Sequence, residues 1–584
     1  MHQRHFARIG PRRAKAIFYF FLLVAGFLTW RLCKVQVIDG PVLAKEALAQ
    51  RSDSVDVFAR RGSILDREGN VLVRSLPSES VYAVPHDIAD ADTTVAKLRG
   101  VFGKLDAQTV ASLHDKHLWF TWIARKIPHE QADRVAALSI PGVALKEEDT
   151  GLRVDTAGQM ASTVLGFVGM DENGLDGVEY AFDSLLRGAS GKVVLETDQF
   201  GRPIPFGHEQ TIKAAKPGMT LQLTLDSYLQ YVTETALDAQ VKKFHAQSGT
   251  AIVMDPWTGA VLAMANSPHF DPNTYWKFPA GDLRDRAVMD AYEPGSTYKL
   301  VTAAAAIDSG KVSTSELFPS IGPLEVGGRR IYNAVDGLTP SSAGDTLETI
   351  IADSLNVGAA KVAIAIGGKT FYAMEQRAGF GEPTKIGLPG ENPGIVPPPS
   401  EWSGSSLATM SFGQGVSVTP IAMARFYSAI ANGGLLLRPR ILHAILNPKG
   451  EVVYEYRPEL VRRVFSKHTA KVLKSFLRAV VVHGTGNPAA QIPGYATAGK
   501  TGTAEVVENG RYEPGAYVAS FIGMVPYDRP RYVIFVKVER PVGSIYGSEV
   551  AAPAFVQIAK AAMLHAGVLP RLVPPPSASK QAPR

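Results

Sequence analysis

A serine and a lysine are spaced in this chain so that together they could carry out acyl transfer. Ser296 follows Pro294 and Gly295, which interrupt regular structure, and the Ala-rich stretch that comes next predicts a helix from Ser296 to Asp308. A serine at a helix N-terminus lies among free backbone amides, which favour an oxyanion. Lys299 lies three residues later on the same helix face, so its amine can reach the serine hydroxyl. To act as a base, this lysine must be neutral near physiological pH, which requires burial or a neighbouring cation.

Two further motifs accompany this pair. Ser354 and Asn356 fall in a second predicted helix, and the run Lys500, Thr501, Gly502 and Thr503 occupies a predicted strand. Lysine and threonine can hold a substrate carboxylate, and glycine lets a peptide approach the strand backbone. The Ser-X-X-Lys spacing alone is weak evidence, because it recurs at 577–580. All three motifs in this order predict a serine acyl-transfer enzyme acting on a peptide that ends in D-alanine.

The elements that must position these motifs form an α+β pattern. Two apolar runs at 250–254 and 260–265, joined by a turn, predict a hairpin, and three more strands are predicted at 495–506, 517–525 and 531–539. Together they predict an antiparallel sheet of about five strands. The helices expected to pack on it are 226–244, 296–308, 350–366, 420–432, 467–482 and 551–566.

The 584-residue chain is too long for one hydrophobic core, so several domains are expected. Residues 34–218 alternate short β-rich runs with helix-like stretches, which predicts an extended α/β module. The catalytic domain is expected at 219–567. A proline-rich tail at 568–584 is expected to be disordered.

The first 40 residues predict a membrane anchor. Residues 16–30 carry no charge and follow several basic residues, and the apolar segment extends to about residue 33. A cleaved signal peptide is the main alternative, but Trp30, Arg31 and Leu32 stand where small residues are needed for cleavage. We therefore expect a cytoplasmic tail at 1–15, a retained helix at 16–33, and the rest of the chain outside the cytoplasm.

Composition excludes several other classes of function. The formal net charge is +6, but the basic residues are dispersed among nearly as many acids, so nucleic-acid binding is not predicted. Cys33 is the single cysteine, which excludes an intrachain disulfide. No cysteine or histidine cluster has metal-ligand spacing, so neither a metal nor another cofactor is expected.

The motifs resemble those of the class B penicillin-binding proteins, and among these they look like the division-specific transpeptidase of Gram-negative bacteria. The resemblance covers nearly the whole chain. It includes Arg61, Gly62, Asp66, Arg153, Gly174 and Glu179 in the first module, and the blocks 292–299, 412–420, 484–486 and 500–503 in the second. It implies the penicillin-binding transpeptidase fold, with the non-catalytic, dimerisation-like pedestal before it and one transmembrane helix.

The resemblance also implies roles for individual residues. Ser296 would be the nucleophile, and Lys299 would take its proton. Ser354 and Asn356 would shuttle protons and orient the donor amide. Lys500 and Thr503, with Thr501 and Gly502, would bind the terminal carboxylate, while the backbone amides of Ser296 and Thr503 would form the oxyanion hole.

The function implied is cross-linking of peptidoglycan stem peptides with release of D-alanine, inhibited covalently by β-lactams. Its expected place is the inner membrane at the division septum, with the catalytic domain periplasmic. The implied partners are a polytopic peptidoglycan glycosyltransferase and other division proteins.

The sequence departs from the family pattern in two places, and it leaves several alternative functions open. Leu355 stands where division enzymes usually carry serine, and Asp155 and Thr156 replace a Tyr-Pro pair, which keeps an elongation-specific enzyme possible. A β-lactamase would need a glutamate that holds a hydrolytic water, and Glu391 lies at a suitable distance along the sequence after the second motif. Its Gly- and Pro-rich setting, however, predicts a surface turn. A minor carboxypeptidase activity and a β-lactam sensor or scaffold are the remaining alternatives.

Overall fold

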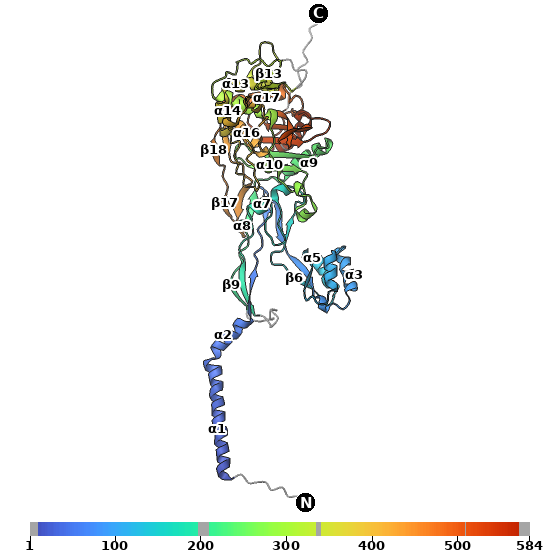
Figure 1. Ribbon diagram of the computed structural model, residues 1–584, viewed down its shortest axis with the longest axis vertical. Coiled ribbons are helices and arrows are strands. Elements are labelled where there is room, and N and C mark those ends of the chain that lie inside the picture. The colour runs from blue at the N-terminus through green and yellow to red at the C-terminus, as the bar shows by residue number, and fades with distance from the viewer. Residues whose placement is uncertain (1–9, 197–208, 335–339, 509, 572–584) are drawn as a thin grey trace. The chain divides into compact units, whose positions relative to one another are not determined.

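The computed structural model describes residues 10–196, 209–334, 340–508 and 510–571, and the chain divides into two units. The first unit comprises Met1–Ala59 with Ala189–Lys216, and the second comprises Arg60–Gly188 with Pro217–Arg584. Most of the predicted cytoplasmic tail and most of the predicted disordered C-terminal tail lie outside the described residues, because these exclude 1–9 and 572–584. Figure 1 gives the element labels used below.

The first unit begins with the predicted apolar helix. Helix α1 (Pro11–Cys33) runs on through a π-helical segment, Lys34–Ile38, and is followed by α2 (Gly40–Arg51). Residues Pro11–Ile38 are long and apolar enough to cross a membrane, and none of the side chains of α1 is buried. So much exposed apolar surface requires a lipid environment. The unit also holds an antiparallel sheet in the order β1 (Ser52–Val57), β8 (Gly191–Glu196), β9 (Glu209–Lys213).

The second unit contains a small subdomain early in the chain. Its antiparallel sheet has the order β5 (Thr121–Pro128), β4 (Ser78–Ala83), β6 (Val143–Glu147). Three helices pack against this sheet: α3 (Ala91–Phe102), α4 (Ala107–His114) and α5 (His129–Ala137). Asp90 and Asp106 cap α3 and α4 by accepting bonds from backbone amides in the first turn, as short polar N-cap residues do.

A six-stranded sheet joins early and late segments of this unit. The strand order is β17 (Val452–Glu455), β16 (Leu442–Leu446), β10 (Thr220–Leu223), β2 (Ile64–Leu65), β3 (Val71–Leu76), β7 (Leu152–Asp155). Beside it, Arg61 Nε donates to Glu179 Oε2 at 2.6 Å, and Arg153 Nε donates to Glu179 Oε1 at 2.7 Å. Glu179 lies on the short helix α7 (Gly177–Ala181), and Asp183, a second partner of Arg61, begins α8 (Asp183–Leu186). The short helix α6 (Ser162–Leu165) precedes them in the chain. This sheet contains strands from both sides of residue 219, where the catalytic domain was expected to begin. The domain boundary at residue 219 therefore stays a prediction.

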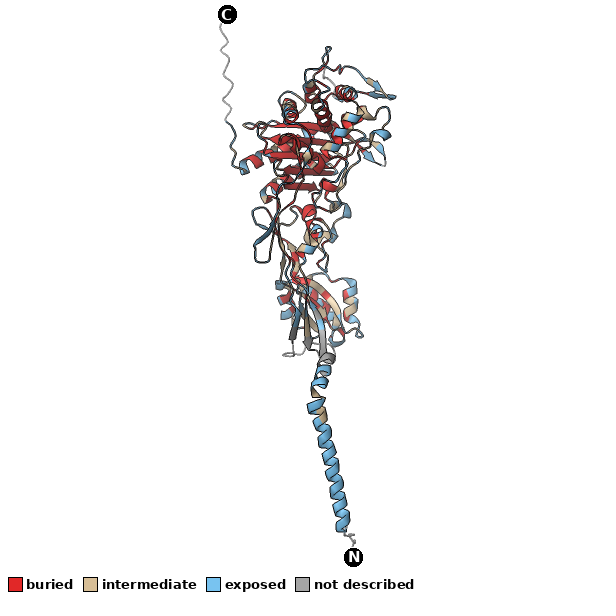
Figure 2. Cartoon of the chain, turned by 90° about the vertical axis from the view of Figure 1, so that its left-hand side faces the viewer, coloured by how far each residue is buried: buried red, intermediate tan, exposed pale blue. Residues whose placement is uncertain are grey.

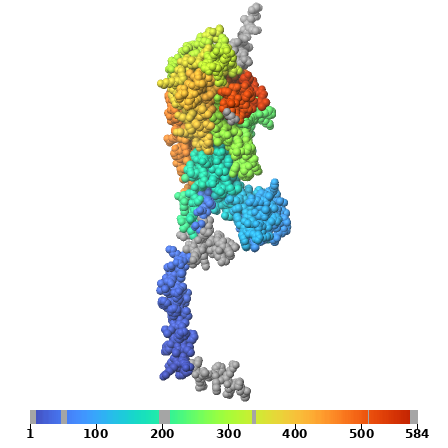
Figure 3. Space-filling view, viewed as in Figure 1, coloured from blue at the N-terminus to red at the C-terminus, as the bar shows by residue number. Residues whose placement is uncertain are grey.

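The predicted antiparallel sheet of the catalytic region is confirmed. Its order is β12 (Val261–Ser267), β11 (Ser248–Met254), β21 (Tyr532–Glu539), β20 (Arg511–Val525), β19 (Ala498–Glu508), and all four pairings are antiparallel. Strand β11, from the middle of the chain, thus pairs with β21, near its C-terminal end. Figure 3 shows the surface of the chain coloured from the N-terminus to the C-terminus. Strand β19 is the last in the order, so among the described strands none pairs with its outer edge.

Helices cover both faces of this sheet, and the most deeply buried residues gather there (Figure 2). Neighbouring residues of a strand point to opposite faces, so Phe521 and Ile522 enter two different apolar clusters. The Phe521 cluster includes α9 (Ser227–Lys243) and α19 (Ala552–His565). The Ile522 cluster includes α11 (Lys299–Asp308), α13 (Asn356–Ile366), α16 (Pro420–Ala431) and α17 (Lys467–Val482). The α+β prediction is confirmed.

The single helix predicted over 350–366 is wrong. Helix α12 (Leu347–Ala352) ends before Asp353, and α13 begins at Asn356. Ser354 lies between them at φ +60°, in the left-handed region that continues no right-handed helix. The break turns the Ser354 carbonyl and hydroxyl towards a buried lysine, so a local departure from helical pattern coincides with the chemistry.

Smaller elements complete the second unit. They are α10 (Arg286–Met289), β13 (Leu324–Val326), β14 (Arg329–Ile331), α14 (Gly368–Ala378), α15 (Ser406–Met410), β15 (Leu435–Leu437), β18 (Leu460–Arg463) and α18 (Gly547–Val550).

Candidate active site

Ser296 lies on a tight turn wedged between two other segments. The turn is the 3-10 helix η5 (Gly295–Tyr298), which leads directly into α11. Gly295 has φ +54°, and a Cβ there would lie 2.7 Å from the Thr503 carbonyl oxygen. A Cβ at Gly413 would lie 2.3 Å from the Gly295 carbonyl oxygen. Only glycine therefore fits at these two contacts, and the nucleophile turn is held closely against strand β19.

Two buried hydroxyls fix the same turn from behind. Thr297 Oγ1 donates to the Pro294 carbonyl at 2.7 Å, and Tyr427 Oη on α16 donates to the Thr297 carbonyl at 2.8 Å. Each bond satisfies a backbone acceptor that would otherwise be buried without a partner. The Ser296 side chain is left half-exposed, facing a cavity.

Lys299 contacts the hydroxyl that it was predicted to activate. Its Nζ lies 3.0 Å from Ser296 Oγ, 3.1 Å from Ser354 Oγ and 2.5 Å from the Ser354 carbonyl oxygen. The side chain is fully buried. Burial, and then the nearby charge of Lys500, hold the pKa of Lys299 well below its usual range. A lowered pKa favours the neutral amine of Lys299 over its ammonium form, and the neutral amine is the form a base requires.

Ser354 lies between two buried amines. Lys500 Nζ lies 3.0 Å from Ser354 Oγ, on the other side from Lys299, and it also contacts the Thr501 carbonyl oxygen at 3.2 Å. Burial lowers the pKa of Lys500 to about 7, against the opposing effect of Asp353. Ser354 thus connects two amines with lowered pKa values, and its hydroxyl can pass a proton between them.

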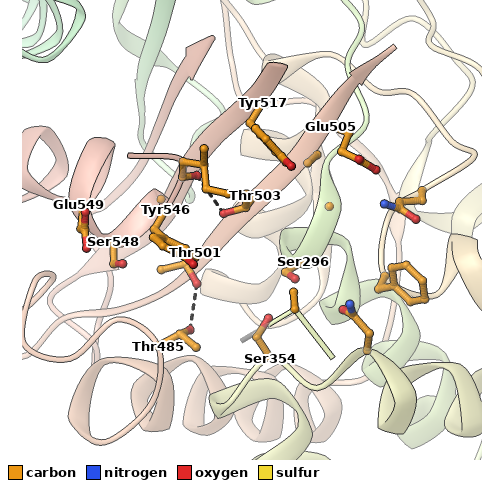
Figure 4. A pocket seen from close by; sticks show the side chains of 18 residues that line it. Ser296, Ser354, Thr485, Thr501, Thr503, Glu505, Tyr517, Tyr546, Ser548 and Glu549 are labelled. Carbon is orange, nitrogen blue, oxygen red and sulfur yellow. Dashed lines mark hydrogen bonds between the residues drawn. The ribbon is translucent and has the colours of Figure 1, made fainter. Parts of the chain in front are cut away.

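These groups open onto a cavity of about 520 Å³. Figure 4 shows Ser296 and Ser354 at its centre and the side chains of β19 along one wall. Its lining comprises Gly295, Ser296, Ala334, Ser354, Asn356, Phe412, Gln414, Thr485, Thr501, Thr503, Ala504, Glu505, Tyr517, Ile545, Tyr546, Gly547, Ser548 and Glu549. Among the described residues, no group of three or more histidine, cysteine or acidic residues is placed to hold a metal ion.

The structure brings the eight predicted site residues together but gives them three different positions. Five of them line the cavity: Ser296, Ser354, Asn356, Thr501 and Thr503. Lys299 and Lys500 are fully buried behind that surface. Gly502 lies where β19 passes η5, since a Cβ there would come within 3.0 Å of Thr297 Cγ2.

The burial of Lys500 changes what can contact a substrate carboxylate directly. The Lys500 ammonium faces Ser354 and Thr501 and does not line the cavity. The hydroxyls of Thr501 and Thr503 do line it, and Thr501 Oγ1 shares a hydrogen bond of 2.9 Å with Thr485 Oγ1. A substrate carboxylate at this wall would contact the hydroxyls of Thr501 and Thr503 directly, and the charge of Lys500 would act from behind them.

Sequence reasoning missed part of the cavity wall. Ile545 to Glu549 lie some 40 residues beyond the last motif, and the Ile545 carbonyl accepts a bond from Thr503 Oγ1 at 3.2 Å. No residue pattern marked this segment. Glu505, in contrast, could have been found, because alternation along a strand places Thr501, Thr503 and Glu505 on one face.

Glu391, the residue that a hydrolytic alternative would use, is engaged elsewhere. Its carboxylate accepts bonds from the backbone amides of Thr384 at 2.5 Å and Lys385 at 3.0 Å. It does not line the cavity. The carboxylate closes its own turn, as expected for this Gly- and Pro-rich segment.

Comparisons with known proteins give one consistent picture. Residues 249–560 match the penicillin binding protein transpeptidase domain, and residues 56–223 match the penicillin-binding protein dimerisation domain. Stage V sporulation protein D of Bacillus subtilis is 34% identical over 569 residues, covering 96% of this chain and 86% of the relative. The peptidoglycan D,D-transpeptidase FtsI of Escherichia coli is 32% identical over 543 residues, covering 91% of this chain and 88% of the relative.

A solved structure extends the similarity to three dimensions. The crystal structure of penicillin binding protein 3 from Mycobacterium tuberculosis, complexed with aztreonam, is 30% identical and has a TM-score of 0.68. The similarity covers 89% of this chain and 99% of that one. Fold and sequence therefore agree over nearly the whole chain.

Proposed function

Because this chain belongs to the class B penicillin-binding proteins, we propose that it is a peptidoglycan D,D-transpeptidase that works through an acyl-enzyme on Ser296. The observation that carries the proposal is the chain of contacts Ser296, Lys299, Ser354 and Lys500, each within 3.1 Å of the next. A serine hydroxyl beside a neutral amine is an activated nucleophile.

In the first half-reaction, Ser296 Oγ attacks the carbonyl carbon of the penultimate D-alanine. The hydroxyl proton passes to the neutral amine of Lys299 as the new C–O bond forms. The oxyanion is held by the backbone amides of Ser296 and Thr503, each contributing about 3 kcal/mol. Collapse breaks the amide bond, and the departing nitrogen of the terminal D-alanine takes a proton through Ser354.

The second half-reaction runs the same steps in reverse. The amine of an acceptor stem peptide attacks the ester carbonyl, and neutral Lys299 takes a proton from that nitrogen. The Ser296 oxygen then leaves and recovers its proton, which completes the cross-link and regenerates the enzyme. A β-lactam would acylate the same oxygen, but its amine stays tethered to the adduct.

The binding of the donor peptide is proposed from the cavity wall. The terminal carboxylate lies against the hydroxyls of Thr501 and Thr503, with the Lys500 charge behind them. Asn356 orients the donor amide through its side-chain amide, which also donates to the Tyr332 carbonyl at 3.0 Å. The unpaired edge of β19 accepts the extended donor as an added strand.

The apolar helix of the first unit supports a proposal for where in the cell the reaction takes place. The apolar helix at Pro11–Ile38 anchors the chain to a membrane. We place the basic N-terminus in the cytoplasm and the catalytic domain in the periplasm, following the distribution of positive charge. The proposed site of action is the division septum, beside a polytopic glycosyltransferase and other division proteins, and an elongation role is the second candidate.

The test is to incubate the detergent-solubilised full chain with a stem pentapeptide ending in D-Ala-D-Ala and an amine acceptor. We expect one D-alanine released per cross-linked product, and no release by Lys299→Met. Release of D-alanine without cross-linked product would indicate a carboxypeptidase. If folded wild type releases no D-alanine and also forms no adduct with penicillin, the proposal is refuted.

A further inference from the structure

The cavity wall next to the nucleophile carries a carboxylate that the proposed mechanism does not use. Glu505 follows Thr503 by two residues on β19, and both side chains line the cavity on the same face of the strand. Figure 4 shows Thr501, Thr503 and Glu505 in a row along this wall, with Tyr517 beside Glu505. Glu505 and Tyr517 are cross-strand partners. Glu505 therefore has a fixed place relative to the reacting carbonyl.

That place corresponds to one residue of the donor peptide, given the proposed function on which this inference rests. The acyl carbonyl lies at Ser296, opposite Thr503, and the leaving D-alanine extends towards Thr501 and Thr485. The residue before the two D-alanines must then extend the other way, towards Glu505. Thr503 and Glu505 are two residues apart on the strand, which corresponds to about 7 Å. The side chain of the donor residue next to the acyl carbonyl can span that distance.

The charge around this position is negative. The cavity lining described above contains two carboxylates, Glu505 and Glu549, and no lysine or arginine. Within the described part of the chain, Glu505 belongs to no ion pair. Burial raises the pKa of Glu293, and the charge of Glu505 raises it further, so the two carboxyls are neighbours. The facing cation is Arg329, which lies near Glu293 and Tyr512 and does not line the cavity.

A half-buried carboxylate in a wall without cations favours a cationic ligand group. We propose that Glu505 is a specificity-determining residue that selects donor stem peptides whose residue before D-Ala-D-Ala carries a side-chain ammonium group. The aliphatic stem of that side chain packs on the Tyr517 ring, and its ammonium group donates to the Glu505 carboxylate. A donor with a neutral or acidic side chain there leaves the carboxylate without this partner.

The experiment uses matched thioester donors, N-acetyl-X-D-alanyl-thioglycolate, in which X is lysine, Nε-acetyl-lysine or glutamate. Acylation of the detergent-solubilised full chain releases the thiol, which is measured spectrophotometrically. For wild type we expect kcat/KM for the lysine donor to exceed that for the acetyl-lysine donor about tenfold. This factor is larger than an exposed ion pair gives and smaller than a buried, charged hydrogen bond gives, because Glu505 is half-buried. The ratio should fall with added salt.

Variants locate the origin of the preference, and each ratio is taken within one variant so that a general loss of rate cancels. Glu505→Gln should bring the ratio to about one, and Glu505→Lys should favour the glutamate donor. The matched control is Glu549→Gln, at the opposite end of the cavity in Figure 4, which should keep the wild-type ratio.

Two kinds of failure are distinguishable. A wild-type ratio near one, an unchanged ratio in Glu505→Gln, or loss of the ratio in Glu549→Gln instead would overturn the assignment to Glu505. If wild type reacts neither with the thioesters nor with benzylpenicillin at Ser296, the proposed function itself fails.

Discussion

Replacing Lys500 by methionine should stabilise the protein while it removes activity. The lysine is fully buried, and within the described residues its ammonium contacts only hydroxyl and carbonyl oxygens. Burial lowers its pKa from the ordinary 10.5 to about 7. A folded state that binds a proton more weakly than the unfolded chain loses stability as the pH falls between these two values. Methionine fills a similar volume and carries no proton to lose.

The magnitude follows from the two pKa values, at about 1.4 kcal/mol per pH unit. At pH 8 the unfolded lysine is charged and the folded one is mostly neutral, which costs the wild type about 3 kcal/mol. At pH 10 the cost falls below about 1 kcal/mol. The lost hydrogen bonds offset about 1 kcal/mol of the gain at both pH values. The free energy of unfolding of Lys500→Met minus that of wild type should therefore decrease by about 2 to 3 kcal/mol from pH 8 to pH 10.

The assay is urea unfolding of the full chain in detergent, followed by tryptophan fluorescence at both pH values. A suitable control is Lys537→Met, because Lys537 is equally buried but its ammonium lies 3.4 Å from the Glu539 carboxylate. This control should destabilise the protein at both pH values, since it leaves a carboxylate unpaired. A stability difference for Lys500→Met that stays constant or grows with pH would refute the reasoning about buried amines.

Three further predictions concern the site and its support. Ser354→Ala removes the hydroxyl between Lys299 and Lys500, so acylation by fluorescent penicillin should slow about 10²- to 10⁴-fold, and a normal rate would contradict the proton path. The acylation rate of wild type should fall as the pH is lowered through the pKa of Lys299, because protonation removes the neutral amine that acts as the base; stopped-flow measurement of a rate that rises instead would exclude a lysine base. Glu179→Gln should lower the free energy of unfolding by about 3 kcal/mol, since it weakens the buried partner of two arginines, and urea titration of a variant as stable as wild type would contradict this.

The sequence predicted well those features that depend on local pattern. Apolar β runs separated by Asp255 to Gly259 predicted the hairpin, and its two strands pair as expected. The long helix predicted over 226–244 is present as α9, and Asp226 accepts a bond from the Leu229 amide at its start. The three spaced motifs identified side chains that now lie within hydrogen-bond distance of one another, because their chemistry requires those residue types together.

Features set by tertiary packing could not be predicted in the same way. Ser354 breaks a stretch that reads as one helix, and the left-handed backbone there serves contacts with a lysine 55 residues earlier. The position of Lys500 behind the cavity surface depends on how β19 meets the Ser296 turn. The wall from Ile545 to Glu549 enters the site through the packing of α18, and no spacing rule connects it to the motifs.

The division of the chain into domains depends on contacts between segments that are far apart in the sequence. The six-stranded sheet joins Ile64 and Leu65 to strand β10, beyond the predicted start of the catalytic domain. Such pairing between distant strands leaves no signal in either segment alone. The apolar helix at the N-terminus, in contrast, was predicted from composition because its length is set by the bilayer.

The most direct test of the account is intact-mass spectrometry of the full chain after treatment with benzylpenicillin, for wild type and Ser296→Ala, followed over hours. The account predicts a stable adduct of one drug molecule on wild type and none on the variant. An adduct that persists on folded Ser296→Ala, or none on folded wild type, would contradict the assignment of Ser296 as the nucleophile.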